Sequence, residues 1–397
     1  MKVLQINTFG NMSTGKIACD ITKTLIEKGY DGSVAFARNS IQKNIPYYKI
    51  GNKYDVYFHV LMARITDRVG FYSKNATIKL LKYIDEEKPD IIHFHNLHGY
   101  YINIELLINY IRQNEIPVVY TLHDCWSFTG HCCNFEFIKC YKWKKQCINC
   151  PQLKEYPKVY FDNSKNNYEK KKNLFTSIPM TVVTPSIWLK NYVKESFLRN
   201  QKVITIRNGI DLNVFKPTYG TWVLENNLKN KKIILSVAGT WTKKKGLEDI
   251  CKLSERLSDD YKIVMVGVNK KLEGKIPKKI LTIQRTTNMQ ELAEIYTAAF
   301  CLINLTYEDN FPTVNLEALA CGTPVIMYDT GGGIEIINKK NGCIVKKGNI
   351  EEVYQSIKNL NCSFEDCLKS GRYFDRKLVF DEYIELYQAL LNGEKDK

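Results

Sequence analysis

Residues 300–328 read FCLINLTYEDNFPTVNLEALACGTPVIMY: an apolar run, a polar loop, an apolar segment closed by glycine, and a second apolar run. This pattern predicts a strand over Phe300–Leu305, a helix over Thr313–Ala320 that ends before Gly322, and a strand over Pro324–Tyr328. Short apolar strands joined through a helix are typical of a parallel sheet. The stretch therefore favours an α/β fold.

The same alternation of apolar runs and helix-like segments recurs on both sides of this stretch. Runs such as 90–95 and 117–123 resemble buried parallel strands, and the alternation restarts after a turn-rich segment that ends at Pro217. A chain of 397 residues also exceeds the size at which one core keeps growing. We therefore expect an α/β protein with two doubly wound, Rossmann-like domains that face a central cleft. We expect an N-terminal domain at 1–207, a C-terminal domain at 208–371 and a final helical segment at 372–397 that can pack back on the first domain.

The charge of the chain is basic and unevenly distributed. The formal net charge is +15, and residues 1–200 hold 28 Lys and Arg against 17 Asp and Glu, a balance of +11. Either a solvated lysine-rich surface or a face turned toward nucleic acid, phospholipid or a pyrophosphate substrate fits this excess. No run approaches the roughly 18 apolar residues of a membrane span, and the first residues suit a strand better than a signal peptide. We therefore predict a cytoplasmic protein.

Two acidic residues mark the start of the helix in the opening stretch. Asp309 lies in the loop before the helix and Glu317 in its second turn. Free N–H groups and the positive end of the helix dipole suit a diphosphate, while carboxylates accept hydrogen bonds from sugar and ribose hydroxyls. The simpler interpretation is that Asp309 only interacts favourably with the helix dipole and that Glu317 is a solvated surface residue. If the stretch binds the diphosphate and sugar of a nucleotide sugar, we expect Phe311, Thr313 and Val314 to contact that ligand as well.

The whole length resembles glycosyltransferase family 4, whose members are retaining enzymes of the GT-B fold. The stretch is similar to the family's pair of glutamates separated by seven residues, with Glu317 at the second position, Asp309 at the first, and Glu308 beside it. The resemblance implies that the first acid approaches the donor sugar and that the second binds the ribose.

Residues 238–247, AGTWTKKKGL, resemble the family's Gly-Arg…Lys-Gly element, whose cations neutralise the leaving pyrophosphate. Lys245 matches the lysine, and Thr240 stands where the arginine usually is. The chain has no Asp-x-Asp, the usual collector of a divalent cation. The lysine and the helix dipole must then supply the positive charge, so we predict metal-independent chemistry that requires no cofactor.

Three further elements resemble the family. Residues 12–17 are similar to its N-terminal loop over the diphosphate, where Gly15 permits close approach to the ligand. His95 matches a histidine at a strand end near donor sugar and acceptor, although a lone histidine is often only structural. Residues 207–211, which contain Asn208, resemble the Asn-Gly-Ile/Val-Asp hinge beside the donor.

A cysteine cluster is not explained by these motifs. Of 13 cysteines, 6 lie between residues 125 and 150, within a predicted insertion at 125–160. A structural zinc, a redox pair or disulfides, and unligated buried thiols all fit the spacing. The zinc ligands would be Cys132, Cys140, Cys147 and Cys150.

Taken together, the sequence predicts a retaining hexosyltransferase that acts in surface polysaccharide biosynthesis, such as that of a capsule. The donor would bind the second domain and a glycan or lipid-linked glycan the first. The aromatic and basic residues of 134–160 would dock on an anionic membrane, as a peripheral protein on its inner face. One rival is a nucleotide-sugar epimerase or hydrolase. A basic zinc-binding nucleic-acid protein is the other, but it leaves Asp309 and Glu317 unexplained, so we expect no nucleic-acid partner.

Overall fold

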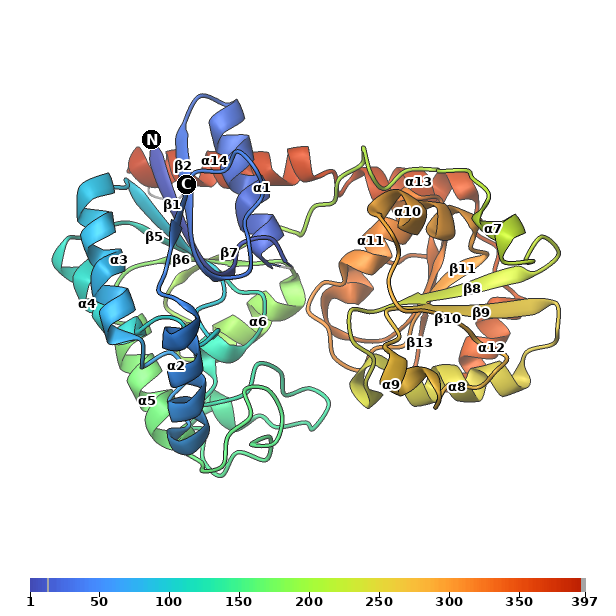
Figure 1. Ribbon diagram of the computed structural model, residues 1–397, viewed down its shortest axis with the longest axis horizontal. Coiled ribbons are helices and arrows are strands. Elements are labelled where there is room, and N and C mark those ends of the chain that lie inside the picture. The colour runs from blue at the N-terminus through green and yellow to red at the C-terminus, as the bar shows by residue number, and fades with distance from the viewer. Residues whose placement is uncertain (13, 394–397) are drawn as a thin grey trace. The chain divides into compact units, whose positions relative to one another are not determined.

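The computed structural model describes residues 1–12 and 14–393, which form two compact units (Figure 1). Unit 1 holds residues 1–206 together with the chain from Phe380 onward, and unit 2 holds residues 207–379. Ser13, in the predicted phosphate loop, and residues 394–397, at the end of the predicted C-terminal segment, lie outside the described residues. Each unit has its own hydrophobic core.

Unit 1 is built on a parallel sheet of seven strands in the order β3-β2-β1-β4-β5-β6-β7. Its central strands are buried on both faces, as strands covered by helices on both sides must be. Their bounds are β1 Lys2–Phe9, β2 Asp31–Arg38, β3 Tyr47–Lys49, β4 Ile91–Phe94, β5 Val118–Thr121, β6 Thr181–Thr184 and β7 Lys202–Thr205.

Helices connect the successive strands of unit 1 except β2 and β3, and a long irregular segment follows β5. Asn52 begins α2 with a capping box in which its side chain accepts from the Asp55 N–H and Asp55 accepts from the Asn52 N–H. The helices are α1 Thr14–Glu27, α2 Lys53–Thr66, α3 Lys74–Glu87, α4 Ile104–Gln113, α5 Ser164–Phe175 and α6 Ile187–Glu195, with short 3₁₀ turns η1 Trp126–Phe128 and η2 Lys142–Lys144.

The last helix, α14 (Arg376–Leu391), starts in unit 2 and continues into unit 1. The Tyr387 hydroxyl lies 2.6 Å from Nδ1 of His93 in β4, and the Tyr383 hydroxyl lies 3.1 Å from the Thr121 hydroxyl in β5. All four residues are buried. The C-terminal part of the chain is thus a structural part of unit 1.

Unit 2 contains a parallel sheet of six strands in the order β10-β9-β8-β11-β12-β13. The helix predicted over Thr313–Ala320 is confirmed, and the predicted strands on either side appear as β11 and β12. The strands are β8 Lys232–Val237, β9 Tyr261–Val266, β10 Leu281–Ile283, β11 Cys301–Asn304, β12 Val325–Tyr328 and β13 Gly342–Val345. The helices are α7 Trp222–Glu225, α8 Leu247–Arg256, α9 Lys270–Glu273, α10 Met289–Ala298, α11 Thr313–Ala320, α12 Ile350–Lys358 and α13 Phe364–Arg372, with 3₁₀ turns η3 Lys243–Lys245 and η4 Gly331–Glu335.

Two parallel-sheet, Rossmann-like units confirm the predicted α/β class. In each sheet the strand order reverses at one place, between β1 and β4 in unit 1 and between β8 and β11 in unit 2. Ligands of doubly wound sheets bind outside the carboxyl ends of the strands at such reversals. The loops that follow these four strands are therefore the expected positions of ligand-binding residues.

Candidate functional site

Two ion pairs join the loops at the reversal in unit 2. The Lys245 ammonium of η3 lies 2.7 Å from Oδ2 of Asp309, and the Lys244 ammonium lies 3.3 Å from Oε2 of Glu308. The Tyr307 N–H also donates to the Lys244 carbonyl oxygen at 2.8 Å. The side chain of Glu308 is 4% exposed and that of Asp309 24%. Asp309 is thus the more accessible of the two neighbouring acids.

Glycines allow these loops to approach one another. Gly246 has φ +75°, and a Cβ at that position would stand 2.2 Å from the carbonyl oxygen of Leu305. Gly331 has φ +54°, and its Cβ would stand 1.7 Å from the carbonyl oxygen of Asp309. Both positions need a residue without a side chain. The Lys-Gly pair at 245–246 and the glycines at 331–333 therefore shape the backbone around the two acids.

Glu317 lies in α11 and is oriented by a buried tyrosine. The Tyr296 hydroxyl donates to Oε2 of Glu317 at 2.8 Å, and Tyr296 is fully buried. Burial and the neighbouring Glu317 raise the pKa of Tyr296 well above its ordinary value, so the hydroxyl remains a donor. Sequence reasoning missed Tyr296, since nothing in its helix distinguishes it from a core aromatic.

The remaining predicted donor residues of unit 2 differ in exposure. Thr313 and Val314, at the start of α11, are partly exposed, and Thr240 is exposed with its hydroxyl on the Gly239 carbonyl oxygen. Phe311 is 3% exposed, with its ring against Phe374, so its side chain belongs to the core. The Asn208 amide donates to the Phe311 carbonyl oxygen at 3.2 Å, a contact inside the unit. Donor binding by these residues stays a prediction.

In unit 1 the structure places His95 inside the sheet. It is 1% exposed, with Nε2 2.8 Å from Oε1 of Gln5 and Nδ1 3.0 Å from Nε2 of His123. Burial, with the nearby His93 and His123, lowers the pKa of His95 well below its ordinary value. His95 is therefore a neutral interior side chain bonded at both nitrogens, and its predicted contact with substrate stays untested.

Gly15 also has a local role that the sequence did not reveal. A Cβ at Gly15 would stand 2.3 Å from the carbonyl oxygen of Phe9, at the carboxyl end of β1. The glycine is needed because α1 begins directly against this strand. Close approach to a ligand stays a prediction.

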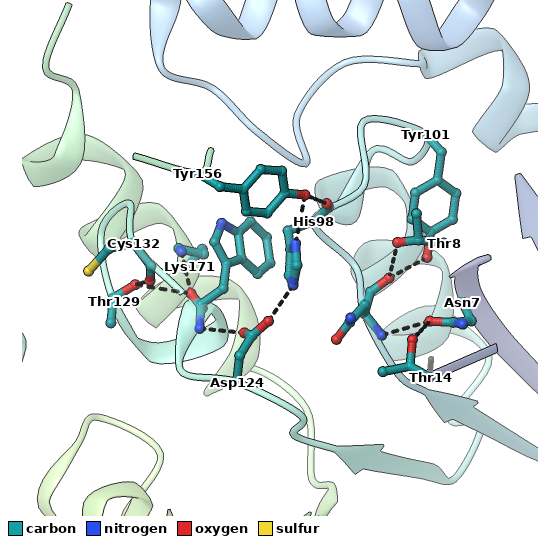
Figure 2. A network of polar contacts seen from close by, with 12 residues as sticks. Asn7, Thr8, Thr14, His98, Tyr101, Asp124, Thr129, Cys132, Tyr156 and Lys171 are labelled. Carbon is teal, nitrogen blue, oxygen red and sulfur yellow. Dashed lines mark hydrogen bonds and ion pairs between the residues drawn. The ribbon is translucent and has the colours of Figure 1, made fainter. Parts of the chain in front are cut away.

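A polar network that the sequence did not predict lies beyond β4 and β5 (Figure 2). Nε2 of His98 is 2.6 Å from Oδ2 of Asp124, and the Tyr156 hydroxyl is 3.2 Å from Nδ1 of His98. The other carboxylate oxygen of Asp124 accepts the Trp126 N–H at 2.9 Å. The loop after β4 and two parts of the long segment after β5 thus meet at the carboxyl ends of these strands. The sequence feature that could have indicated this network is a second histidine, His98, shortly after β4 together with an acid, Asp124, shortly after β5.

The electrostatics of this network favour a carboxylate at Asp124. Burial raises the pKa of Asp124, but the attraction of His98 and hydrogen bonds from His98 and the Trp126 N–H outweigh it and bring the pKa below its ordinary value. The Asp124 side chain is 19% exposed and that of His98 9%. The pair can therefore accept a hydrogen bond from a ligand hydroxyl at the edge of the sheet.

The predicted zinc ligands all lie in the irregular segment after β5. The Cys132 thiol hydrogen bonds with Cys150, and Cys147 has Cys150 and Cys140 as neighbours. Among the described residues, the ligand atoms found within 4.8 Å of one another are instead those of His98, Asp124 and Cys133. Within that trio, Nε2 of His98 and Oδ2 of Asp124 are hydrogen bonded to each other.

One cavity, of about 620 Å³, lies at the opposite edge of the unit 1 sheet. Its lining includes Val118 and Thr181, which begin β5 and β6, and Leu390 of α14. Parallel sheets bind ligands at the other edge, so we do not place the site there. Within residues 1–12 and 14–393, no helix has the length and apolarity needed to cross a bilayer.

Solved structures of other proteins match this fold over nearly the full length of the chain. Sucrose-phosphate synthase from Thermosynechococcus elongatus superposes with a TM-score of 0.73 at 14% identity, covering 99% of this chain and all of that one. Anabaena Alr3699/HepE in complex with UDP-glucose gives a TM-score of 0.68 at 14% identity, covering 98% of this chain and all of that one. At such identities the likeness concerns the fold.

Sequence relatives indicate the class of protein. WcaC of Escherichia coli (strain K12), a glycosyl transferase named for colanic acid biosynthesis, is 23% identical over 318 residues, 76% of this chain and 77% of its own. The N,N'-diacetylbacillosaminyl-diphospho-undecaprenol alpha-1,3-N-acetylgalactosaminyltransferase of Campylobacter jejuni is 22% identical over 51% of this chain and 58% of its own.

Family models cover most of the chain. The model for glycosyl transferases group 1 matches residues 221–365, which lie in unit 2. The model for Glycosyltransferase Family 4 matches residues 15–214, about half of the sequence. The chain is therefore a glycosyltransferase and belongs to glycosyltransferase family 4.

Proposed function

We propose that the protein transfers a sugar from a nucleotide sugar to a glycan or lipid-linked glycan, with retention at the anomeric carbon, during synthesis of a surface polysaccharide. The observation that carries the proposal is the pairing of Lys245 with Asp309 in the loops after β8 and β11, next to the start of α11. A cation, an acid and a helix N-terminus together suit a sugar diphosphate.

Each of these groups has a role in the proposed reaction. Departure of the nucleoside diphosphate develops negative charge on its phosphoryl oxygens, which Lys245 and the N–H groups of α11 stabilise. Asp309 orients the sugar and Glu317 binds the ribose hydroxyls. The acceptor oxygen attacks the anomeric carbon on the face that the diphosphate leaves, and the departing phosphate oxygen takes the acceptor proton. Because lysine supplies the charge, the proposal requires no divalent cation.

A nucleotide-sugar screen tests this function directly. The donor is unknown, so the purified protein is heated with each of a panel of nucleotide sugars. A ligand at ~100 times its dissociation constant stabilises the folded state by about 2.7 kcal/mol. The best binder is then incubated with glycan acceptors and the product's anomeric configuration is read by NMR. A product of inverted configuration, or a panel without any binder, would contradict the proposal.

The rival reaction on the same fold is separated by leaving out the acceptor. A transferase should leave most of the nucleotide sugar intact, whereas a hydrolase or epimerase should convert it at its full rate. The relative from Campylobacter jejuni is named for a diphospho-undecaprenol substrate. A lipid-diphosphate glycan is therefore the first acceptor to test.

Such an acceptor lies in a membrane, and the outer face of α2 suits a membrane surface (Figure 1). The face opposite is buried through Val56, His59 and Ala63. Large apolar side chains 46–69% exposed follow one another on the outer face at helical spacing: Tyr54, Tyr57, Phe58, Leu61 and Ile65. Because only one face of α2 is buried in the protein, the apolar side chains of its other face are exposed to water. Exposing them is unfavourable unless another surface covers them.

The charge beside this face is basic. Lys53, Arg64 and Arg68 are exposed, whereas Asp67 is buried against His131 and Asp55 caps α2. The Tyr160 N–H donates to the Arg64 carbonyl oxygen, which brings exposed Tyr160 and its neighbour Phe161 beside the end of α2. We propose that this α2 face docks on anionic lipid at the inner side of the cell membrane.

Two aromatic residues of the expected docking segment 134–160 are buried. Phe135 and Trp143, which belong to the aromatic segment 134–160, are each 1% exposed and pack in the core. Their rings are therefore unavailable to lipid. Tyr141, Tyr156 and Tyr160 of this segment are exposed, and Tyr160 with its neighbour Phe161 lies beside the end of α2.

Liposome flotation tests the docking. Wild type should float with anionic vesicles at low salt and less at high salt, since salt screens the basic residues. The triple change Tyr57→Ser, Phe58→Ser and Leu61→Ser should abolish flotation. The control changes Tyr219→Ser and Leu224→Ser, at exposed apolar positions of unit 2, should not. Equal recovery on neutral vesicles, or flotation of the triple variant, contradicts the docking.

A further inference from the structure

An arginine beside the strand reversal of unit 1 has no acidic partner. Arg38 ends β2, and its guanidinium lies over the ring of Phe9, the last residue of β1, with 5.3 Å between the guanidinium carbon and the ring centroid. Within residues 1–12 and 14–393, no carboxylate forms an ion pair with Arg38. The strand order reverses between β1 and β4, and ligands of doubly wound sheets bind beyond the carboxyl ends of such strands. Arg38 is therefore a cation that a ligand can reach.

A second arginine without an acidic partner lies on α2. The Arg64 side chain is exposed, and none of the described carboxylates pairs with it. Arg64 and Arg38 come from different elements, but both act electrostatically on one hydroxyl, that of Tyr100 in the loop after β4. Guanidinium groups bind phosphate oxygens through charge-assisted hydrogen bonds. Two unpaired arginines near one hydroxyl therefore favour an anionic ligand at this place.

Tyr100 supplies a buried hydrogen-bond donor beside these charges. The residue is 8% exposed, and its hydroxyl has no hydrogen-bond partner within the described chain. Burial raises the pKa of Tyr100 to about 12, although Arg64 and Arg38 oppose the rise. The hydroxyl therefore stays protonated and can donate to a ligand oxygen. A donor this deeply buried calls for a ligand or a water that completes it.

The loop that carries Tyr100 is held in a strained conformation. Tyr100 has φ +63°, in the left-handed region that a bulky residue rarely adopts. The preceding Gly99 approaches Thr8 so closely that a Cβ there would stand 2.0 Å from the Thr8 Cγ2. The Thr8 and Tyr101 hydroxyls both donate to the Asn96 carbonyl oxygen at 2.9 Å (Figure 2). Such strain persists only where the surroundings impose it, and it is typical of loops that bind ligands.

Tyr156 connects Tyr100 with the His98–Asp124 pair. The Tyr156 ring centroid lies 6.1 Å from that of Tyr100 and 5.7 Å from that of His98. Its hydroxyl is 3.2 Å from Nδ1 of His98. Burial raises the pKa of Tyr156, and Arg38 is among the groups that oppose the rise. A ligand hydroxyl at the His98–Asp124 pair and an anion at Tyr100 would therefore lie beside the same tyrosine ring.

The carboxylates nearest to these tyrosines bond to histidines and not to the two arginines. Asp67 acts on Tyr100, and its Oδ1 lies 2.5 Å from Nδ1 of His131. Asp124 acts on Tyr156, and its Oδ2 lies 2.6 Å from Nε2 of His98. Neither acid neutralises an arginine, so the positive charge beside Tyr100 remains for a ligand.

We propose that Arg38, Arg64 and Tyr100 bind a phosphate group of the acceptor. The sugar that carries this phosphate presents its reacting hydroxyl to His98 and Asp124. The guanidinium groups pair with phosphate oxygens, and the Tyr100 hydroxyl donates to another. This inference rests on the proposed function and specifies its acceptor as a sugar with a phosphate on its anomeric carbon, in place of a long neutral glycan.

Two kinds of acceptor carry such a phosphate. Arg64 belongs to α2, whose outer face is proposed to dock on the membrane, so a lipid-linked sugar diphosphate would reach it from that surface. A soluble sugar 1-phosphate presents the same group without the lipid. Both differ from a phosphate-free glycan, which would leave the two arginines and the Tyr100 hydroxyl without a partner.

Binding of inorganic pyrophosphate tests the site without requiring transfer. The full chain is titrated as Lys245→Ala, because Lys245 is proposed to hold the donor diphosphate in unit 2, and binding is followed by phosphorus NMR. Tyr100→Phe and Arg38→Gln, each added to that chain, should weaken binding about tenfold or more. Arg112→Gln removes an exposed cation at the opposite edge of the sheet and should leave binding unchanged. Binding that survives the first two changes, or that falls equally in the control, would overturn the site.

Transfer kinetics then separate the two sources of phosphate. Wild type should prefer a lipid-linked monosaccharide diphosphate to a phosphate-free glycoside of the same sugar by about tenfold or more in kcat/KM, and Arg38→Gln should remove most of this preference. A soluble sugar 1-phosphate used as well as the lipid form would support the site with a soluble acceptor. No preference for phosphate in wild type would overturn the inference. Intact pyrophosphate binding without any transfer would instead contradict the proposed function and leave the phosphate site standing.

Discussion

The Lys245 ammonium lies 2.7 Å from the Asp309 carboxylate, although the two residues are 64 positions apart in the chain. Their neighbours, Lys244 and Glu308, form a second pair beside them. The two pairs hold the loop after β8 to the loop after β11. Lys245 is the more exposed lysine, with a side chain 38% exposed against 25% for Lys244, so it is the one that can turn to a bound diphosphate.

Lys245→Ala should lower transfer by about 100-fold or more, because it removes a charge that stabilises the leaving diphosphate. The measurement is kcat at saturating donor. Lys243→Ala is the control, since its side chain is 68% exposed and lies 3.7 Å from Glu248. Near wild-type turnover of Lys245→Ala would exclude its proposed role.

Asp309→Asn should reduce transfer more than Glu308→Gln does. Asp309 is the accessible acid, whereas Glu308 is buried and its replacement weakens the pair with Lys244. Glu308→Gln should therefore mainly lower thermal stability, by about 1–3 kcal/mol. Parallel measurements of kcat and unfolding separate the two effects. The reverse order of activities would mean that Glu308 is the acid that faces the sugar.

Tyr296→Phe should raise the donor KM by about tenfold and change kcat little. The substitution removes the hydrogen bond that orients Glu317, and a bond to a carboxylate contributes about 1.5–3 kcal/mol. Tyr328→Phe is the matched control, because its hydroxyl bonds to Asp249 at 2.9 Å instead. A donor KM that rises equally in both variants would show a general loss of structure rather than a role in holding Glu317.

His98→Asn should raise the acceptor KM by about tenfold or more while the donor-induced thermal shift stays unchanged. The reason is that His98 and Asp124 lie at the carboxyl edge of unit 1, where the proposed acceptor binds. Tyr101→Phe, which removes a hydrogen bond to the Asn96 carbonyl oxygen, is the control from the same loop. An effect on donor binding as large as that on the acceptor contradicts this assignment.

Unfolding free energy should fall as the pH drops from 6.5 to 5. Burial lowers the pKa of His123 to about 4 and that of His59 to about 3, and burial with nearby histidines brings the pKa values of His93 and His95 well below the ordinary 6.5. Below pH 6.5 these histidines bind protons in the unfolded chain but not in the folded chain. The free energy of unfolding therefore falls by about 1.4 kcal/mol per pH unit for each site. Urea unfolding at several pH values measures the slope.

Two other groups do not change this slope. Burial opposes protonation of His131, but Asp67 outweighs it and raises its pKa, so its stabilising contribution is fully present below 6.5 and is lost only as the pH rises through the raised value. The lowered pKa of Asp124 contributes stability that is lost only at more acidic pH. His95→Gln should remove one of the four contributing sites and reduce the slope by about a quarter. A flat profile would mean that the buried histidines take up protons in the folded state.

Much of the fold could be predicted from the sequence. The helix over Thr313–Ala320 and the flanking strands follow from an apolar pattern that each segment carries by itself. The glycosyltransferase family could likewise be recognised from local motifs around Lys245 and Glu317. Local patterns determine which segments become strands and which short motifs recur, because both depend on residues close together in the chain.

The direction of individual side chains was decided by tertiary structure. His95 matches a family motif, but its side chain is buried beside His93. His98, three residues later, lies beyond the carboxyl ends of the strands and contacts Asp124 there. Tyr296 orients Glu317 from a different helix, and Lys171 of α5 meets the cysteines of a distant loop. Whether a polar side chain faces the interior or a ligand depends on which segments pack against it, and segments that are far apart in sequence meet only when the sheets form.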